Sequence, residues 1–190
     1  HEILFSLLCR RVFNPSIQSL LYKIISSWHY PATGRGIPIG NLTSQIFANV
    51  YLHELDIFVK RQLHQHWYYR YADDFILFTE TRQQAEQVVA AINSFIFSRL
   101  RLTMHPNKII FRVCHSGVDW LGTILLPGHN VLRPATRRRM IRNIEDKSRV
   151  ADSAQSLVGM LASYNGLLGR VARKTLDKQI AQTVALYNPL

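Results

Sequence analysis

The sequence predicts an α+β fold in which helices back a small antiparallel sheet and a helical segment follows. Two runs rich in aromatic and β-branched residues, 67–71 and 75–78, flank a short polar break, which is typical of a β-hairpin. Apolar residues recur at helical spacing on both sides of this hairpin, and only helical spacing is found from about residue 134 onward. An apolar share of 47% over 190 residues is enough for a buried core.

Helices are expected on both sides of a loop rich in glycine and proline. The i, i+4 spacing predicts a helix over residues 1–13, and Pro15 can open a second helix that ends before Pro31. Residues 31–41 then form the loop, and a long helix follows over about 43–62. The residues expected to face inward from this long helix are Ile46, Phe47, Val50, Tyr51 and Leu55.

The segments after the hairpin contain a helix and short strands before the chain becomes wholly helical. A helix is predicted over 82–100, and short strands are predicted at about 109–113 and 119–126. Pro134 can start a basic helix. Two further helices are expected over 153–163 and 167–187. A domain boundary is expected at about 127–133.

The charge of the chain points to a polyanionic partner. Lys and Arg number 23 against 12 Asp and Glu, which gives a net charge of +11. A ribosomal or chromatin protein can carry the same charge, so charge alone names no activity. Cys9 and Cys114 lack the spacing of a disulfide framework or a zinc site. The longest apolar stretches fall far short of the roughly 20 residues that a membrane-spanning helix needs.

Asp73 and Asp74 are adjacent acids at the expected tip of the hairpin. Asp is common in solvated turns, and an isolated Asp-Asp pair is more often of that kind. Here the pair lies between strands suited to burial, in a basic protein, and adjacent like charges repel each other unless a cation lies between them. Because Mg²⁺ prefers oxygen ligands and nucleotidyl transfer uses two divalent cations, the pair is a candidate metal site.

Residues 70–75, Arg-Tyr-Ala-Asp-Asp-Phe, resemble the YxDD active-site turn of reverse transcriptases. The resemblance implies that Asp73 is a main metal ligand, that Asp74 supports the site, and that a further Asp ligand lies on a strand before the first helix. We expect both acids of the pair to hold metal. Residues 1–4 resemble the segment just after that strand. We therefore expect a fragment without the fingers and without one catalytic carboxylate, in which the palm covers 1–130 and a small helical thumb covers 131–190.

Residues 36–45 resemble the glycine loop before a helix in the same family, and residues 48–56 continue the match, although a plain connecting loop is the alternative. Ile39 stands where Gln is usual. With the residues that follow it, this departure resembles reverse transcriptases of diversity-generating retroelements, which copy RNA with errors at adenines, whereas group II intron enzymes usually keep the Gln. We expect Ile39 to remove a polar contact. The residues expected to bind nucleotide or template here are Ile39, Gly40, Ser44 and Gln45.

Downstream residues extend the expected binding surface. Lys108 stands where the family has a Lys that assists the triphosphate, and a solvated Lys is the alternative. Residues 118–124 resemble the family's primer-grip hairpin, with a turn at 121–122, so Tyr71, Leu121 and Gly122 are expected near the primer terminus. A run of charge is often only a solvated face, but the next segment has the place of the thumb. The arginines expected to bind the nucleic-acid backbone are Arg137, Arg138, Arg139 and Arg142.

The resemblance implies an RNA-directed DNA polymerase that uses two Mg²⁺ ions, or Mn²⁺ in their place. The expected partners are an RNA template, a DNA primer or product, deoxynucleoside triphosphates and a retroelement accessory protein, and no membrane. We expect error-prone synthesis in a prokaryotic cytoplasm, from a cellular or phage gene, and little or no activity of the fragment alone. Two alternatives stay open: a group II intron-type maturase, and an RNA-binding scaffold that has lost catalysis. The intact acid pair argues against the scaffold.

Overall fold

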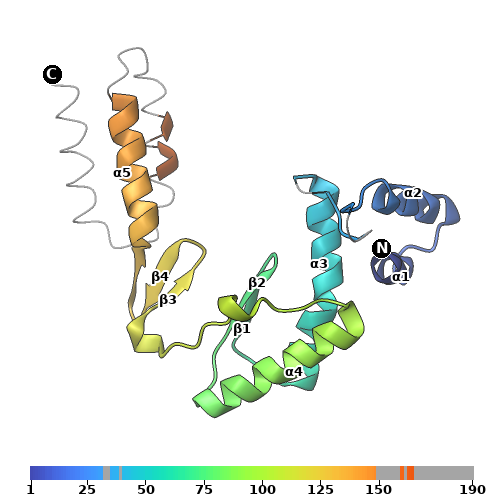
Figure 1. Cartoon of the computed structure of the whole chain (residues 1–190), viewed down its shortest axis with the longest axis horizontal. Helices are drawn as coiled ribbons and strands as arrows, with labels where there is room; N and C mark the ends of the chain where they lie inside the picture. Colours follow the sequence, from blue (N-terminus) through green and yellow to red (C-terminus); the bar gives the residue numbers. More distant parts are fainter. Residues whose placement is uncertain (32–34, 39, 149–158, 161, 165–190) are drawn as a thin grey trace. The chain divides into compact units, whose positions relative to one another are not determined.

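The computed structural model divides the chain into two units, His1–Phe111 and Arg112–Leu190, and each is considered by itself (Figure 1). Helices combined with small antiparallel sheets confirm the predicted α+β class. No helix in the described part of the chain is both long and apolar enough to cross a membrane. The residues that the structure describes are 1–31, 35–38, 40–148, 159–160 and 162–164.

Helices α1 and α2 form the N-terminal part of the first unit. α1 spans Glu2–Cys9, so the helix predicted over 1–13 ends early. The chain turns ahead of Pro15, because the residue before a proline avoids the helical conformation. α2 spans Pro15–Ser26, as predicted, and the Asn14 side chain accepts hydrogen bonds from two of its free amides. The buried cluster that joins these helices to the next one consists of Leu4, Leu8, Ile25 and Phe47.

Helix α3 is shared by both buried clusters of the first unit. It spans Leu42–Ile57 and continues as a π-helical turn over Phe58–Gln62, which confirms the predicted long helix but changes its winding at the end. Phe47 and Leu55 are buried, eight positions apart on one face. Ile46, an expected inward residue, is 53% exposed, because it lies about 100° around the helix from Phe47.

Helix α4 spans Arg82–Leu100, as predicted, and closes the second buried cluster of this unit. Its start is fixed by a capping box, in which the side chains of Thr81 and Gln84 each bond the other's backbone amide. Figure 1 shows α4 running past α3 and the hairpin within the first unit. The buried members of the cluster are Leu55, Val59, Tyr68, Ile92, Ile96 and Leu100.

The predicted hairpin is present as β1, Tyr68–Tyr71, and β2, Asp74–Leu77. Tyr71 pairs with Asp74, so the turn consists of Ala72 and Asp73 and is one residue shorter than the predicted polar break. Asp74 therefore belongs to a strand, with its backbone held by the ladder. Ala72 has a φ of +52°, in the left-handed region that costs an L-residue about 1–2 kcal/mol.

The second unit contains an antiparallel sheet in the order β3-β4-β5. Its strands span Val118–Trp120, Thr123–Leu126 and His129–Leu132. The prediction of one strand over 119–126 is wrong, because the chain reverses at Leu121 and Gly122. These two residues have φ values of +50° and +84°, which is typical of the two-residue turns that match strand twist.

The predicted strand at 109–113 is also wrong, since these residues have no regular secondary structure. Short 3₁₀ turns flank the segment, at Pro106–Lys108 and Cys114–Ser116. An apolar run becomes a strand only where another strand pairs with it, and among the described residues none pairs here.

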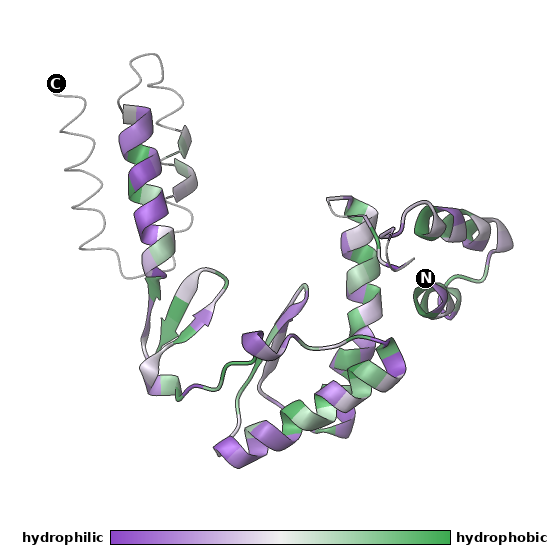
Figure 2. Cartoon of the chain, viewed as in Figure 1, coloured by the Kyte–Doolittle hydropathy of each residue, from purple (hydrophilic) through white to green (hydrophobic). Residues whose placement is uncertain are grey.

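Helix α5 spans Pro134–Ser148, and it begins at the predicted proline. Met140 and Ile144 are buried on one of its faces, and Figure 2 shows that most of the helix is hydrophilic. The helices predicted over 153–163 and 167–187 lie largely outside the described residues. The division into a palm over 1–130 and a thumb over 131–190 stays a prediction.

An ion pair ties β1 to α3. Arg70 Nε and Nη2 donate to Asp56 Oδ1 and Oδ2 at 2.8 and 2.7 Å, a bidentate geometry that makes charged hydrogen bonds strong. The Tyr68 hydroxyl donates to Asp56 Oδ1 at 2.9 Å. Burial raises the pKa of Asp56, but the hydrogen bonds from Arg70 and Tyr68 outweigh it, so this pKa lies below its ordinary value.

We predict that Asp56→Asn lowers the free energy of unfolding at pH 5 by about 2 kcal/mol, because Arg70 loses a charged hydrogen-bond partner. A carboxyl whose pKa is lower in the folded state stabilises the fold when ionised. Its contribution is complete above the unfolded pKa of about 3.9 and is lost as the pH falls through the folded pKa. Denaturant unfolding at pH 5 and pH 3 should therefore show a difference between wild type and variant that shrinks at pH 3.

Glu86→Gln is the matched control, because it breaks an ion pair with Arg82 that is exposed on both sides. It should cost less than about 0.5 kcal/mol. An Asp56→Asn loss that is no larger than this, or one that is the same at both pH values, contradicts the prediction.

Candidate active site

The two acids singled out from the sequence lie at the tip of the β1–β2 hairpin. Asp73 is in the turn and Asp74 is the first residue of β2, and both are exposed. Among the described residues, neither carboxylate makes a hydrogen bond or an ion pair. Two adjacent carboxylates without partners are suited to hold a divalent cation, which relieves their mutual repulsion.

The described residues contain no group of three or more His, Cys, Asp or Glu side chains that could hold a metal. The tip therefore supplies two carboxylates, and the described residues add no third His, Cys, Asp or Glu ligand to them. Carboxylate oxygens are nevertheless the donors that Mg²⁺ and Mn²⁺ prefer, so the chemistry of the pair fits the expected ion.

The register of the hairpin shows which residues lie on its exposed face and which lie on its buried face. Directly paired residues share a face, so Tyr71 lies on the same face as Asp74, and Tyr69 lies beside them opposite Ile76. Tyr69 and Tyr71 are 50% and 63% exposed. Tyr68 is on the other face and belongs to the buried core. Exposed aromatic rings beside a carboxylate pair offer stacking surfaces for bases or sugars.

Sequence reasoning missed the side chains that hold this tip. Arg70 Nη1 donates to the backbone oxygen of Ala72 at 2.7 Å and to Asn49 Oδ1 at 3.1 Å. A signal was available: strand periodicity places Arg70 on the same buried face as Tyr68, and a charge on such a face needs a partner. Its partners, Asn49 and Asp56, lie about two turns apart on the same face of α3, and both are far from Arg70 in the sequence.

The predicted nucleotide or template residues cluster around the start of α3. Gly40 has a φ of +94°, which suits a residue without a side chain, and Gln45 is exposed. Ser44 is 8% exposed, and its buried hydroxyl has no hydrogen-bond partner among the described residues. Ile39 lies outside the described residues.

Helix α3 connects this end to the hairpin tip. Ser44 and Gln45 lie in its first turn, and Asn49 follows one turn later with a hydrogen bond to the guanidinium that also bonds the tip. The loop before α3 is in turn bonded to α1, because His1 Nε2 lies 2.7 Å from the Gly36 backbone oxygen. The structure thus links the predicted nucleotide residues of α3 to the acid pair through one rigid element.

The other predicted residues occupy separate places. Lys108 is exposed in a 3₁₀ turn of the first unit, and nothing in the structure brings it to the tip. Leu121 and Gly122 form the β3–β4 turn of the second unit, where Leu121 is 49% exposed. Of the arginines on α5, Arg137 is partly buried, whereas three are exposed along the face opposite Met140 and Ile144. These three are Arg138, Arg139 and Arg142.

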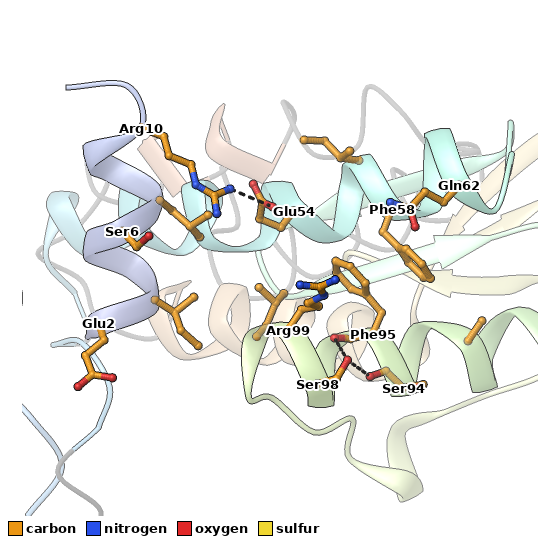
Figure 3. A pocket seen from close by; sticks show the side chains of 15 residues that line it. Glu2, Ser6, Arg10, Glu54, Phe58, Gln62, Ser94, Phe95, Ser98 and Arg99 are labelled. Carbon is orange, nitrogen blue, oxygen red and sulfur yellow. Dashed lines mark hydrogen bonds and ion pairs between the residues drawn. The ribbon is translucent and has the colours of Figure 1, made fainter. Parts of the chain in front are cut away.

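A groove in the first unit is distinct from these residues (Figure 3). It has a volume of about 910 Å³ and lies among α1, α3, the π-helical turn and α4. Arg10 and Glu54 form an ion pair across part of it at 3.7 Å, and Phe58 stacks on Phe95 with ring centroids 4.1 Å apart. None of the predicted site residues lines this groove, so it adds nothing to the candidate active site.

Comparison with known proteins gives the same family as the acid pair. The family model described as "Reverse transcriptase (RNA-dependent DNA polymerase)" matches residues 1–125. Protein YkfC of Escherichia coli (strain K12) is 22% identical over 200 residues, which is 85% of this chain and 51% of YkfC. The group II intron-encoded protein LtrA of Lactococcus lactis subsp. cremoris is 36% identical over 64 residues, which is 31% of this chain and 11% of LtrA.

The chain thus spans about half the length of YkfC and a smaller part of LtrA. The family match itself covers the hairpin with its acid pair, the helices on which the hairpin packs, and the β3–β4 turn. Because this match extends over well more than half of the chain, the protein belongs to the reverse transcriptase family.

Proposed function

We propose that the chain forms the palm and thumb of an RNA-directed DNA polymerase, and that Asp73 and Asp74 hold its catalytic metal ions. The observation that carries this proposal is the exposed carboxylate pair, which has no partner among the described residues and lies on a hairpin anchored to the core. The primer 3′-hydroxyl attacks the α-phosphate of the deoxynucleotide, and pyrophosphate leaves. Mg²⁺ at the pair supplies Lewis-acid polarisation of the reacting oxygens and compensates their charge.

The proposal also requires a carboxylate from another part of the polymerase. Among the described residues, β1 and β2 pair only with each other, so the outer edges of this two-stranded sheet are open to a further strand. The family resemblance places the remaining Asp on a strand before α1. For this reason we expect residues 1–190 alone to extend a primer little or not at all.

We assign the remaining predicted residues to the primer, the nucleotide and the template. The exposed ring of Tyr71, on the face of Asp74, can stack against the primer terminus, and Leu121 with Gly122 forms the primer grip. Ile39, Gly40, Ser44 and Gln45 contact the nucleotide or the template, and the exposed position of Gln45 in the first turn of α3 supports this role. Lys108 assists the triphosphate.

The thumb binds the backbone of the template–primer duplex through α5. Arg138, Arg139 and Arg142 are exposed on one face of this helix, opposite its buried residues, whereas Arg137 is partly buried on the side of Met140 and Ile144. A basic stripe along one helical face matches the spacing of phosphates better than charge scattered around a helix.

Two kinds of parent enzyme remain in competition. Ile39 with Gly40 to Gln45 favours an error-prone enzyme of a diversity-generating retroelement, which acts with an accessory protein in a prokaryotic cytoplasm. The local 36% identity to LtrA favours a group II intron-type enzyme as the second candidate. We prefer the first, because the loop departs from the Gln that intron enzymes usually keep.

The first prediction concerns the acid pair. In the complete polymerase, Asp73→Asn and Asp74→Asn should each lower primer extension by roughly a hundredfold or more, because each removes a charged metal ligand at constant size. Glu80→Gln is the control, since Glu80 is an exposed acid at the other end of the same hairpin. Wild-type rates of primer extension for either Asp variant would overturn the proposed function.

The second prediction concerns fidelity. Replacing Ile39 by Gln in the complete polymerase restores a polar contact worth roughly 1 kcal/mol, so adenine misincorporation should fall several-fold. Ile46→Gln introduces the same change at an exposed position of α3 and should leave the error spectrum unchanged. An Ile39→Gln enzyme with the wild-type error rate at adenines argues against the retroelement assignment.

The third prediction concerns the thumb. If four phosphates are neutralised, log K for template–primer binding should fall with log salt at a slope near −3.6. Arg138→Gln, Arg139→Gln and Arg142→Gln should each make the slope shallower by about 0.9. Arg11→Gln removes the same charge from an exposed position after α1 and is the control. Thumb variants whose salt slope matches that of the control contradict the role of α5.

A further inference from the structure

Arg70 is the one charged residue of β1, and its side chain is only 11% exposed. Its guanidinium donates four hydrogen bonds within the first unit. Nε and Nη2 reach the carboxylate of Asp56, and Nη1 reaches both Asn49 and the backbone oxygen of Ala72. Because a guanidinium has five N–H groups in one plane, these partners fix both its position and its orientation.

The bond to Ala72 acts on the turn that carries the acid pair. Ala72 precedes Asp73 and has a φ of +52°, a conformation that an L-residue keeps only where its surroundings hold it. The hydrogen bond of 2.7 Å from Nη1 to its carbonyl oxygen is a restraint of this kind. Arg70 thereby connects the tip directly to α3, through Asp56 and Asn49.

Asp56 neutralises the charge of Arg70, and Arg70 forms no ion pair with Asp73 or Asp74 among the described residues. Hydrogen bonding with Asp56 raises the pKa of Arg70, so the pair stays ionised. An arginine with free donors beside the tip would compete with a cation for Asp73 and Asp74. Here four donors are occupied, and the described residues show no bond from Arg70 to either acid, so Arg70 does not compete with a metal ion for these carboxylates.

We propose that Arg70 is a positioning residue for nucleotidyl transfer, which holds the Ala72 carbonyl so that Asp73 and Asp74 are presented to the metal ions in one geometry. Asp56 and Asn49 orient its guanidinium for this task. This inference rests on the proposed polymerase function. It adds a specific consequence: disturbing Arg70 changes the rate of the chemical step and its Mg²⁺ dependence more than it changes nucleotide binding.

The test is single-turnover nucleotide addition by the complete polymerase, with varied Mg²⁺ and varied deoxynucleotide. Arg70→Lys keeps the charge but loses the planar fork, so it cannot bond Asp56, Asn49 and Ala72 together. The maximal rate should fall about tenfold or more, and half-saturation should need more Mg²⁺, while the apparent affinity for the nucleotide changes less than about twofold.

Two further variants guard against a loss of folding. Asn49→Ala removes one exposed acceptor of Nη1 but keeps the ion pair with Asp56, so it should shift rate and Mg²⁺ dependence in the same direction by a few-fold. Arg82→Lys makes the same substitution as Arg70→Lys in an exposed ion pair on α4 and should behave as wild type.

Two outcomes overturn the inference. If Arg70→Lys and Asn49→Ala lower thermal stability but leave the rate per folded molecule and its Mg²⁺ dependence as in wild type, Arg70 is only a structural tie and the polymerase function stands. If the wild-type enzyme shows no Mg²⁺-dependent synthesis, or Asp73→Asn retains it, the proposed function fails first and the role of Arg70 fails with it.

Discussion

The guanidinium of Arg70 joins three parts of the first unit: the strand that carries it, helix α3, and the turn at the hairpin tip. A two-stranded hairpin is only marginally stable by itself, so its tip has a defined position only where something else holds it. Packing of Tyr68 in the core holds the base of this hairpin, and the hydrogen bond to Ala72 holds its end. The position of the acid pair depends on both the packing of Tyr68 and the hydrogen bond from Arg70 to Ala72.

This arrangement makes α3 the reference element for the whole site. Its first turn carries Ser44 and Gln45, and its later turns carry the two side chains that orient Arg70. The loop before α3 and the hairpin are therefore both attached to the same helix. The net charge of +11 favours polyanions in general, whereas the acids at the tip, which have no partner among the described residues, form one small region of negative charge.

Local signals made much of this fold predictable. Apolar residues at helical spacing over 82–100 predicted α4, the proline at position 15 predicted the start of α2, and two adjacent acids between apolar strands identified the tip. The strand pattern missed the β3–β4 turn because Leu121 and Gly122 lie inside an apolar run without a polar break, and only the family resemblance indicated a hairpin there. The partners of Arg70 were not predicted because they lie on another element, 14 and 21 residues away. Periodicity shows that a charged residue is on a buried face, but it does not identify the residue that pairs with it.

The most direct test of the account is the location of the metal in the complete polymerase bound to template–primer, an unreactive nucleotide and Mn²⁺. Anomalous scattering from crystals of this complex would place the ions. The account predicts manganese at about 2.1 Å from carboxylate oxygens of Asp73 and Asp74, next to the nucleotide phosphates, with Arg70 still bonded to the Ala72 carbonyl. Ions bound elsewhere, with both aspartates directed into solvent, would contradict it.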